Sequence, residues 1–483
     1  TLGDRSSDLI IPAVGGFVQD SVSLGGNIKL DLGLRYDFIA SPTEPNNKLV
    51  VFDASKDALV RLGSGIDQIH KNGSDFQPRL GLIWNPTGTG DLVVRGAYAV
   101  MVNQTNTGYV VNSASNPPLA TPLNVSAAVK LDTAFATAQA SGLAPTTTSP
   151  NFLPGRTQTW NVNVEKELAG NGVMVGYFGS YGDRQRIPVN INQPVNGVRP
   201  YLTLSPTSPI SPGATLGNII EVQSAGWSHY KGLWVTLNRP MTKRLQLASS
   251  YTLSKSTDTN SYDATGATAN GSLQNSYDLT DSYGPSDFDV RHRFTVSGTY
   301  ELPFHGNRLK DGWQVTGVLQ LQTGNPVNII TNINTLTGVT SLRPDLVGDP
   351  TGNKSVTQYF NASVCDPRTA APVAAPCTSS SVFALPYSAS GVLHLGNMPR
   401  NLIYGPGFNN TDLSLIKNLT LSGQARVQLR VEVFNLFNVA NLGQPGRIAL
   451  VNSTAFGVIT NTRSATGDSG SARQVQFAAK FLF

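Results

Sequence analysis

Few residues in this sequence have the types and spacing that chemistry needs. The five histidines (His70, His229, His292, His305 and His394) are isolated from one another, and none belongs to HExxH or another metal-ligand motif. No nucleophile lies in a recognisable arrangement with a general base. The glycine stretches GPGF and LGGN precede no helical pattern, which makes them turns rather than phosphate-binding loops. We therefore predict that the chain is not an enzyme and has no metal or cofactor.

The densest acidic segment is YDLTDSYGPSDFD, which contains Asp278, Asp281, Asp287 and Asp289. Four carboxylates in one loop could bind Ca²⁺, but their spacing is not that of an EF-hand. We therefore favour the other interpretation, a solvated acidic loop.

The two cysteines, Cys365 and Cys377, lie in the Pro/Ala-rich segment CDPRTAAPVAAPC. Neither lies in an apolar segment that would bury a free thiol. A pair that closes a short loop is typical of a disulfide formed in an oxidising compartment such as the periplasm or cell surface. Two free thiols in an open loop are the alternative, and we predict the disulfide.

The composition separates this chain from ordinary soluble domains. Charged residues make up 13% of its 483 residues, about half the usual share. Mean hydropathy is −0.12, and no apolar run approaches the roughly 18 residues of a spanning helix. The net charge is +5, but Lys and Arg never cluster, which argues against a nucleic-acid surface. The start, TLGDRSSDLIIPAVGG, lacks the pattern of a signal peptide, so we expect none in this sequence.

Period-2 alternation recurs along the chain instead of helical periodicity. In IKLDLGLRYDF the apolar residues Ile28 to Phe38 take every second position, and Lys29, Asp31, Arg35 and Asp37 lie between them. This segment is longer than the usual strand of about five or six residues. It matches the roughly 9–11 residues with which a tilted strand crosses a bilayer.

Thirteen segments qualify as strands. They cover residues 16–22, 28–38, 76–84, 91–100, 157–168, 172–181, 229–239, 244–254, 288–302, 313–324, 409–417, 427–435 and 472–483. Short and long connections alternate between them, and the long ones are Ile39–Asp75, Val102–Arg156, Gly182–Ser228, Ser256–Asp287, Thr331–Phe408 and Asn438–Arg473. Long loops count against a soluble domain, whereas bacterial outer-membrane barrels have short periplasmic turns and long external loops.

We therefore predict an all-β fold, a transmembrane antiparallel β-barrel in the outer membrane of a Gram-negative bacterium. A spanning sheet must close on itself, with an apolar outer face and a polar inner face. A soluble barrel and a β-propeller are the alternatives, but no blade repeat of roughly 40–50 residues is present. Because such barrels have even strand numbers, we expect at least one more strand ahead of Thr1.

Charged residues on the polar faces of the strands are expected to face the lumen. They are Lys29, Asp31, Arg35, Asp37, Arg291, Arg293, Arg430 and Glu432. Arg291 and Arg293 could attract an anionic ligand. The favoured interpretation is that they pair with neighbouring acids such as Glu301 or Glu432.

Several motifs resemble those of a known family. FVQDSVSLGGNIKLDLGLRYDF resembles a strand pair of TonB-dependent outer-membrane transporters. SDFDVRHRFTVSGTYELPF, GWQVTGVLQLQTGNPVNI, RNLIYGPGFNNTDLSLIKNLTL, VQLRVEVFNLFNVANLG and SARQVQFAAKFLF are similar to successive strands of its Oar-like branch. The resemblance runs from about Phe17 to Phe483. It implies a 22-stranded barrel closed by an N-terminal plug, so residues 1–483 are expected to be the C-terminal part of that barrel, without the plug.

The resemblance also implies a function. The expected activity is uptake of a bulky, scarce ligand (siderophore, cobalamin, saccharide or peptide), driven through a TonB-type energy-coupling protein. Outer-membrane lipid and lipopolysaccharide are the other expected partners, and nucleic acid is not one. A surface adhesion protein and a passive porin are the alternatives. The terminal aromatic residues Phe477, Phe481 and Phe483 are expected to face lipid, and they resemble the signal that the barrel-assembly machinery recognises.

Overall fold

The computed structural model describes most of the chain. The described residues are 2–3, 6–63, 68–103, 107–118, 120–121, 143–261, 273–333, 342–369, 373–422, 425–463 and 472–482.

Thirteen long strands form one antiparallel sheet in which each strand pairs with the next along the chain. They are β2 (Ala13–Leu24), β3 (Ile28–Ile39), β6 (Gly73–Trp84), β7 (Leu92–Val102), β10 (Arg156–Leu168), β11 (Asn171–Asn190), β12 (Ile220–Thr242), β13 (Leu245–Asp258), β15 (His292–Glu301), β16 (Trp313–Gln322), β22 (Phe408–Ser422), β23 (Ala425–Phe434) and β24 (Gln474–Leu482). This confirms the thirteen predicted strands and their antiparallel order.

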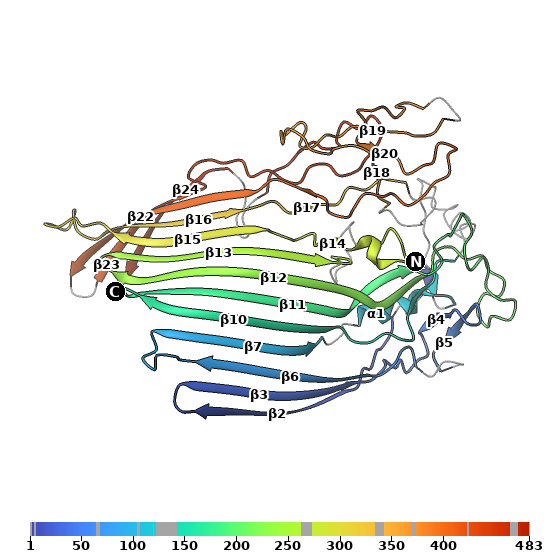
Figure 1. The fold of residues 1–483 in the computed structure, drawn as a ribbon, viewed down its shortest axis with the longest axis horizontal. Coiled ribbons are helices and arrows are strands. Elements are labelled where there is room, and N and C mark those ends of the chain that lie inside the picture. Colours follow the sequence, from blue (N-terminus) through green and yellow to red (C-terminus); the bar gives the residue numbers. More distant parts are fainter. Residues whose placement is uncertain are drawn as a thin grey trace.

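The connections separate to the two ends of the strands, with the turns at one end and the long loops at the other (Figure 1). The tightest described turns are Ala169–Gly170 (φ 51° and 76°) and Lys243–Arg244 (φ 47° and 71°), with the positive φ at both residues that such two-residue hairpin turns require. The long connections are 40–72, 103–155, 191–219, 259–291, 323–407 and 435–473.

The clearest differences from the predicted strand boundaries are in β11, β12, β15 and β22. β11 and β12 have 20 and 23 residues, so they extend far into the connection predicted as Gly182–Ser228. Register shifts around Gln185 interrupt the pairing there, which breaks the alternation that a sequence pattern depends on. β15 begins at His292 rather than Phe288. β22 continues to Ser422, beyond the predicted strand end at Lys417.

The register gives the sheet one apolar and one polar face, because paired residues of neighbouring strands share a face. Val235 pairs with Val175 on one side and Tyr251 on the other. The next residue, Thr236, pairs with Met174 and Ser250 on the opposite face. Many apolar-face side chains are exposed, including Leu32, Leu80, Val162, Val175 and Leu233. An exposed apolar surface of this extent requires an apolar environment.

The buried hydrophobic clusters lie in the long connections instead. One contains Val327, Ile329, Phe360, Phe383, Met398 and Phe456. A second gathers Leu49, Val51, Ile69 and Phe152, and a third gathers Phe52, Leu59, Leu204 and Ile219. The loops therefore fold around cores of their own and form a layer at one end of the sheet, which we call the loop layer.

Short elements build this layer. Two-stranded pairs join β4 (Val50–Asp53) to β5 (Ala58–Arg61), β17 (Pro326–Val327) to β21 (Ile403–Tyr404) and β1 (Leu2–Gly3) to β8 (Ala120–Thr121). A three-stranded sheet contains β18 (Asp345–Leu346), β20 (Phe383–Ala384) and β19 (Val364–Cys365), while β9 (Thr146–Thr148) pairs with β12 and β14 (Gly284–Pro285) with β13. The helices in the described part of the chain are α1 (Gly108–Val111), η1 (Asn112–Ser115) and η2 (Leu279–Ser282). Within the described residues, no helix is long and apolar enough to cross a membrane.

Candidate functional site

Strand β3 places four of the predicted charged residues on the polar face. Lys29 lies 3.7 Å from Asp31. Further along the strand, Arg35 donates two hydrogen bonds of 2.8 and 2.7 Å to Asp37. Gln77 of the neighbouring strand donates a third to the same carboxylate. The polar face is therefore lined here by mutually neutralised charges.

The same face carries further pairs on neighbouring strands. Arg95 of β7 pairs with Glu165 of β10. Near the loop layer, Asp75 of β6 pairs with Arg184 of β11 at 2.8 Å. Each of these pairs connects two strands, so it holds the side chains of the polar face in place. Because each pair contains one charge of each sign, no concentrated charge of one sign is left on this face.

The predicted partners of Arg291 and Arg293 are wrong. Glu432 lies 4.0 Å from Arg430, and Glu301 accepts a hydrogen bond of 3.2 Å from Gln314. Arg293 pairs across the sheet with Thr252 and Gln322 on the polar face, and Arg291 precedes β15. Glu301 is eight residues further along β15, roughly 27 Å away, and Glu432 is three strands away, so neither is within reach.

Most of the acidic segment is structural rather than solvated, and of its four aspartates only Asp278 is exposed. Asp278 accepts a hydrogen bond of 2.9 Å from the backbone N–H of Thr280 at the start of η2. Asp281 pairs with Arg343 at 2.8 Å. Asp289 is only 1% exposed; it accepts hydrogen bonds of 2.7 Å from the Ser256 backbone and 3.1 Å from the Tyr404 hydroxyl. Burial and the Asp289 charge raise the pKa of Tyr404 to about 12. The carboxylates thus point to separate partners.

No group of three or more metal-ligating side chains occurs in the part of the chain that the structure describes. The carboxylates of the acidic segment each have a protein partner, as Asn401 shows by donating a 2.6 Å hydrogen bond to Asp287. This segment holds loops together instead of presenting open oxygen ligands.

Two buried arginines connect the loops. The Arg343 guanidinium donates to the Met398 carbonyl at 2.7 Å and to the Asp281 carbonyl at 2.9 Å. Burial lowers the pKa of Arg343, and the Asp281 charge opposes that shift. Arg400 donates to the carbonyls of Asp258 and Ser282 at 3.1 and 2.9 Å and pairs with the Asp258 carboxylate. The end of β13 is therefore tied to two long connections.

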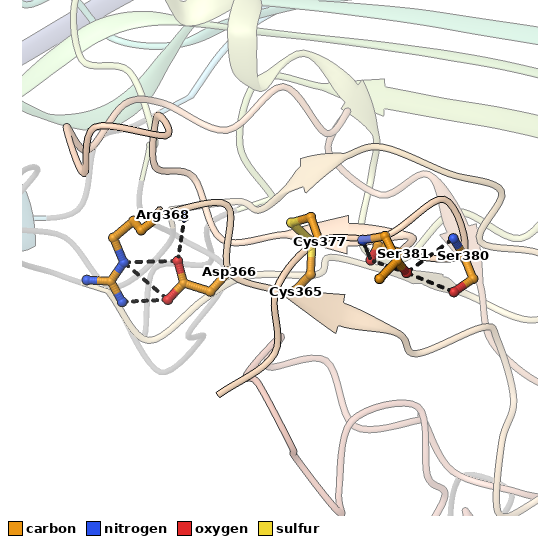
Figure 2. Close-up of a disulfide and its surroundings, with 7 residues drawn as sticks. Cys365, Asp366, Arg368, Cys377, Ser380 and Ser381 are labelled. Carbon is orange, nitrogen blue, oxygen red and sulfur yellow. Dashed lines mark hydrogen bonds and ion pairs between the residues drawn. A yellow bond between two sulfur atoms is a disulfide. The ribbon is translucent and has the colours of Figure 1, made fainter. Parts of the chain in front are cut away.

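A disulfide joins Cys365, the last residue of β19, to Cys377 (Figure 2). The S–S distance is 2.01 Å and the Cα atoms are 4.9 Å apart. On one side of the bridge, Arg368 forms an ion pair with Asp366, and on the other Ser381 accepts a 3.0 Å hydrogen bond from the Thr378 backbone. The bridge closes a loop on the outer part of the loop layer.

A cavity of about 580 Å³ lies between three of the long connections. The walls come from residues 193–197, from Asn275 and Tyr277, and from residues 392–395. Tyr277 donates a 2.8 Å hydrogen bond to the Gln193 carbonyl, and His394 Nε2 lies 2.7 Å from an Asp345 carboxylate oxygen. The first contact joins two of the walls, and the second holds His394 within the third. The walls combine aliphatic side chains with backbone and imidazole polar groups. Ligand sites in proteins have this size and mixture.

Sequence reasoning missed the cavity, Arg343 and Arg400. Each depends on contacts between segments that are distant in sequence, such as Arg400 with Asp258 across 142 positions. The predicted site residues on the polar face were detectable because alternation places them locally. We find no comparable local signal for the loop residues.

Comparison with known proteins identifies the sheet. The family model described as "Outer membrane beta barrel domain" matches residues 4–476. The chain belongs to this family. As an outer membrane beta barrel it lies in the outer membrane, with lipid against its apolar face. The exposed aliphatic side chains of that face thereby gain the apolar environment they require.

The terminal strand of this outer membrane beta barrel follows the same pattern. Phe477 and Phe481 pair with Val431 and Val427 on the apolar face, and they are 77% and 56% exposed. Phe483 lies outside the described residues. The role of these side chains in assembly stays a prediction.

Several solved receptor structures resemble the fold of this outer membrane beta barrel. The siderophore receptor PiuA from Acinetobacter baumannii is 12% identical, with 98% of this chain and 43% of the receptor covered and a TM-score of 0.45. The pyoverdine receptor FpvA from Pseudomonas aeruginosa PAO1 is 11% identical, with 99% of this chain and 43% of the receptor covered and a TM-score of 0.46. The ferric citrate transporter FecA is 11% identical, with 99% of this chain and 46% of the transporter covered and a TM-score of 0.44. The chain thus spans less than half the length of these receptors. No curated protein shows significant sequence similarity to it.

Proposed function

We propose that this chain is the wall and loop part of an importer that takes up a bulky, scarce ligand and is energised through a TonB-type coupling protein. The motif resemblance supports the coupling, and with it a complete barrel of 22 strands closed by a plug. Residues 1–483 would form the C-terminal portion of that barrel. The ligand classes consistent with the resemblance are siderophores, cobalamin, saccharides and peptides.

The observation that carries this proposal is the cavity in the loop layer, which we call the loop cavity. Three connections contribute its walls, and it lies at the end of the sheet where the long loops gather. A ligand captured there would meet a polar, charge-neutralised wall below it. Such a wall solvates a passing ligand without holding it by strong charge attraction.

The test measures growth of a deletion strain across iron and carbon sources, followed by uptake of the ligand so identified. In the complemented strain we expect Val392→Asp to raise the half-saturating concentration at least tenfold, which is about 1.4 kcal/mol of binding free energy. Leu202→Asp is the matched control, because Leu202 has the same exposure (63% against 64%) but does not line the loop cavity. Equal effects of both substitutions would contradict the assignment of the cavity.

Removal of the coupling protein separates the alternatives. We expect uptake to stop while ligand binding to the cell surface persists. Uptake that continues would indicate a passive porin. Binding without uptake in the presence of the coupling protein would indicate a surface-interaction protein.

A further inference from the structure

Two lysines lie directly opposite each other on the apolar face of the barrel. Lys231 of β12 pairs in register with Lys255 of β13, and both side chains are exposed. Like charges at directly opposed positions destabilise a sheet. On the face that contacts lipid, each ammonium group also loses hydration. An anion beside the two lysines would therefore stabilise this arrangement.

The chain supplies no such anion among the described residues. Asp183, which lies towards the loop layer, pairs with Arg156 at 2.6 Å. Asp258 pairs with the buried Arg400. No hydrogen bond or ion pair joins Lys231 or Lys255 to a described residue. The nearby carboxylates are therefore used elsewhere, and the charge of both lysines is left for an external ligand.

The lysines lie at the level of lipid headgroups. The next pair on the same face, two residues further from the loops, is Leu233 with Leu253, at the edge of the aliphatic band. One step towards the loops, the ring of His229 lies 4.7 Å from that of Tyr181. Aromatic side chains mark the membrane–water boundary in this position. Long lysine side chains extend their charge into that boundary, where anionic headgroups are found.

A second cavity lies at the loop ends of β15, β16 and β22, and we call it the rim cavity. Its volume is about 460 Å³, and its walls include Tyr251, His292, Phe294 and Leu321 from three adjacent strands. His292 pairs with Leu253, which is two residues from Lys255. Tyr251 is four residues from Lys255 on the same face, or about 13 Å along the strand.

A loop segment that is held in place by hydrogen bonds covers part of the rim cavity. Residues 439–442, from the connection after β23, form part of its lining. Asn441 accepts a 2.8 Å hydrogen bond from the Asn409 backbone and donates one of 3.0 Å to the Asn409 carbonyl. The apolar cavity is thus held open beside the bilayer, where hydrocarbon chains are the available occupants.

We propose that Lys231, Lys255 and the rim cavity together bind a phosphorylated, acylated lipid of the outer leaflet. The two ammonium groups bind its phosphate, and one acyl chain enters the cavity between Tyr251, Phe294 and Leu321. A soluble anion would use the lysines alone, and a neutral lipid the cavity alone. The combination selects an anionic lipid, and it does so whether or not the barrel transports anything.

The test counts lipids that remain bound to the purified full chain by native mass spectrometry after addition of bis-phosphorylated lipid A. The double variant Lys231→Gln/Lys255→Gln is expected to lose bound lipid A at least fivefold. The matched control is Lys166→Gln/Lys243→Gln. Lys166 lies on the same face at the opposite end of the strands, paired with Leu92 and Val173, and Lys243 lies in the turn between β12 and β13. This control is expected to bind lipid A like the wild type.

A cavity variant keeps the proposal testable if the lysine variant folds poorly. Leu321→Trp places a larger side chain in the rim cavity and is expected to reduce lipid A binding while both lysines remain. Phosphatidylethanolamine and millimolar inorganic phosphate are the competitors, and neither is expected to displace lipid A. Unchanged lipid A binding in the folded lysine variant, or full displacement by either competitor, would overturn the proposal.

Discussion

Replacing Arg400 with alanine is expected to loosen the loop layer while the barrel strands stay paired. Arg400 and Asp258 have side chains that are each 5% exposed, and their ion pair joins the end of β13 to the connection 323–407. Removing one partner of a buried ion pair costs about 3–5 kcal/mol, because the remaining charge is left without compensation. Local opening of residues 278–289 and 397–404 should therefore rise from roughly a hundredfold to several thousandfold.

Hydrogen exchange of the purified protein measures this opening segment by segment. Arg368→Ala is the control. Arg368, like Arg400, forms an ion pair with an aspartate, but its partner lies in the same loop and its side chain is 42% exposed. We expect Arg400→Lys to lie between the wild type and the alanine variant, since lysine keeps the charge but cannot reach all the acceptors that the guanidinium bonds. Unchanged exchange in Arg400→Ala would show that the loop layer does not depend on this contact.

Introducing arginine at Val235 is expected to prevent stable assembly, whereas arginine at the next residue is not. Val235 lies in the middle of the apolar face, between Val175 and Tyr251. A charged side chain at the bilayer midplane on the lipid face costs about 2–4 kcal/mol. Thr236 lies on the polar face, between Met174 and Ser250, where a charged group stays hydrated.

The two variants differ by one position and carry the same new charge. Folded barrel is measured by its heat-modifiable electrophoretic mobility and by the urea midpoint in liposomes. Val235→Arg should lower both, and Thr236→Arg should keep both near wild-type values. Equal losses at the two positions would mean that the faces are not distinguished by lipid.

The sheet was predictable because a bilayer imposes a local rule. Each strand must alternate between lipid and a polar interior, so residues such as Lys29 and Asp31 are placed by their immediate neighbours. The same rule located β23. This strand ends at Phe434, where the alternation of apolar and polar residues becomes irregular. The match to the outer membrane beta barrel family agrees with the membrane barrel that the alternation predicts.

The loop layer was not predictable, because its contacts ignore sequence order. Arg400 meets Asp258, and Asp289 is buried although four aspartates in a short segment suggest a solvated loop. The extensions of β11 and β12 were not predicted from the sequence, for a related reason. Register shifts around Gln185 end the simple alternation, and Ile187 and Val189 pack into a buried cluster of the loop layer.

The central claim is that the apolar face of this sheet contacts lipid and the polar face contacts water. The most direct measurement places a nitroxide label at each position from 233 to 237 of β12 in liposomes. Collision with oxygen reports lipid, and collision with a water-soluble nickel chelate reports water. Labels at positions 233, 235 and 237 should favour oxygen, and those at 234 and 236 should favour the chelate. Equal chelate access at all five positions would contradict the account.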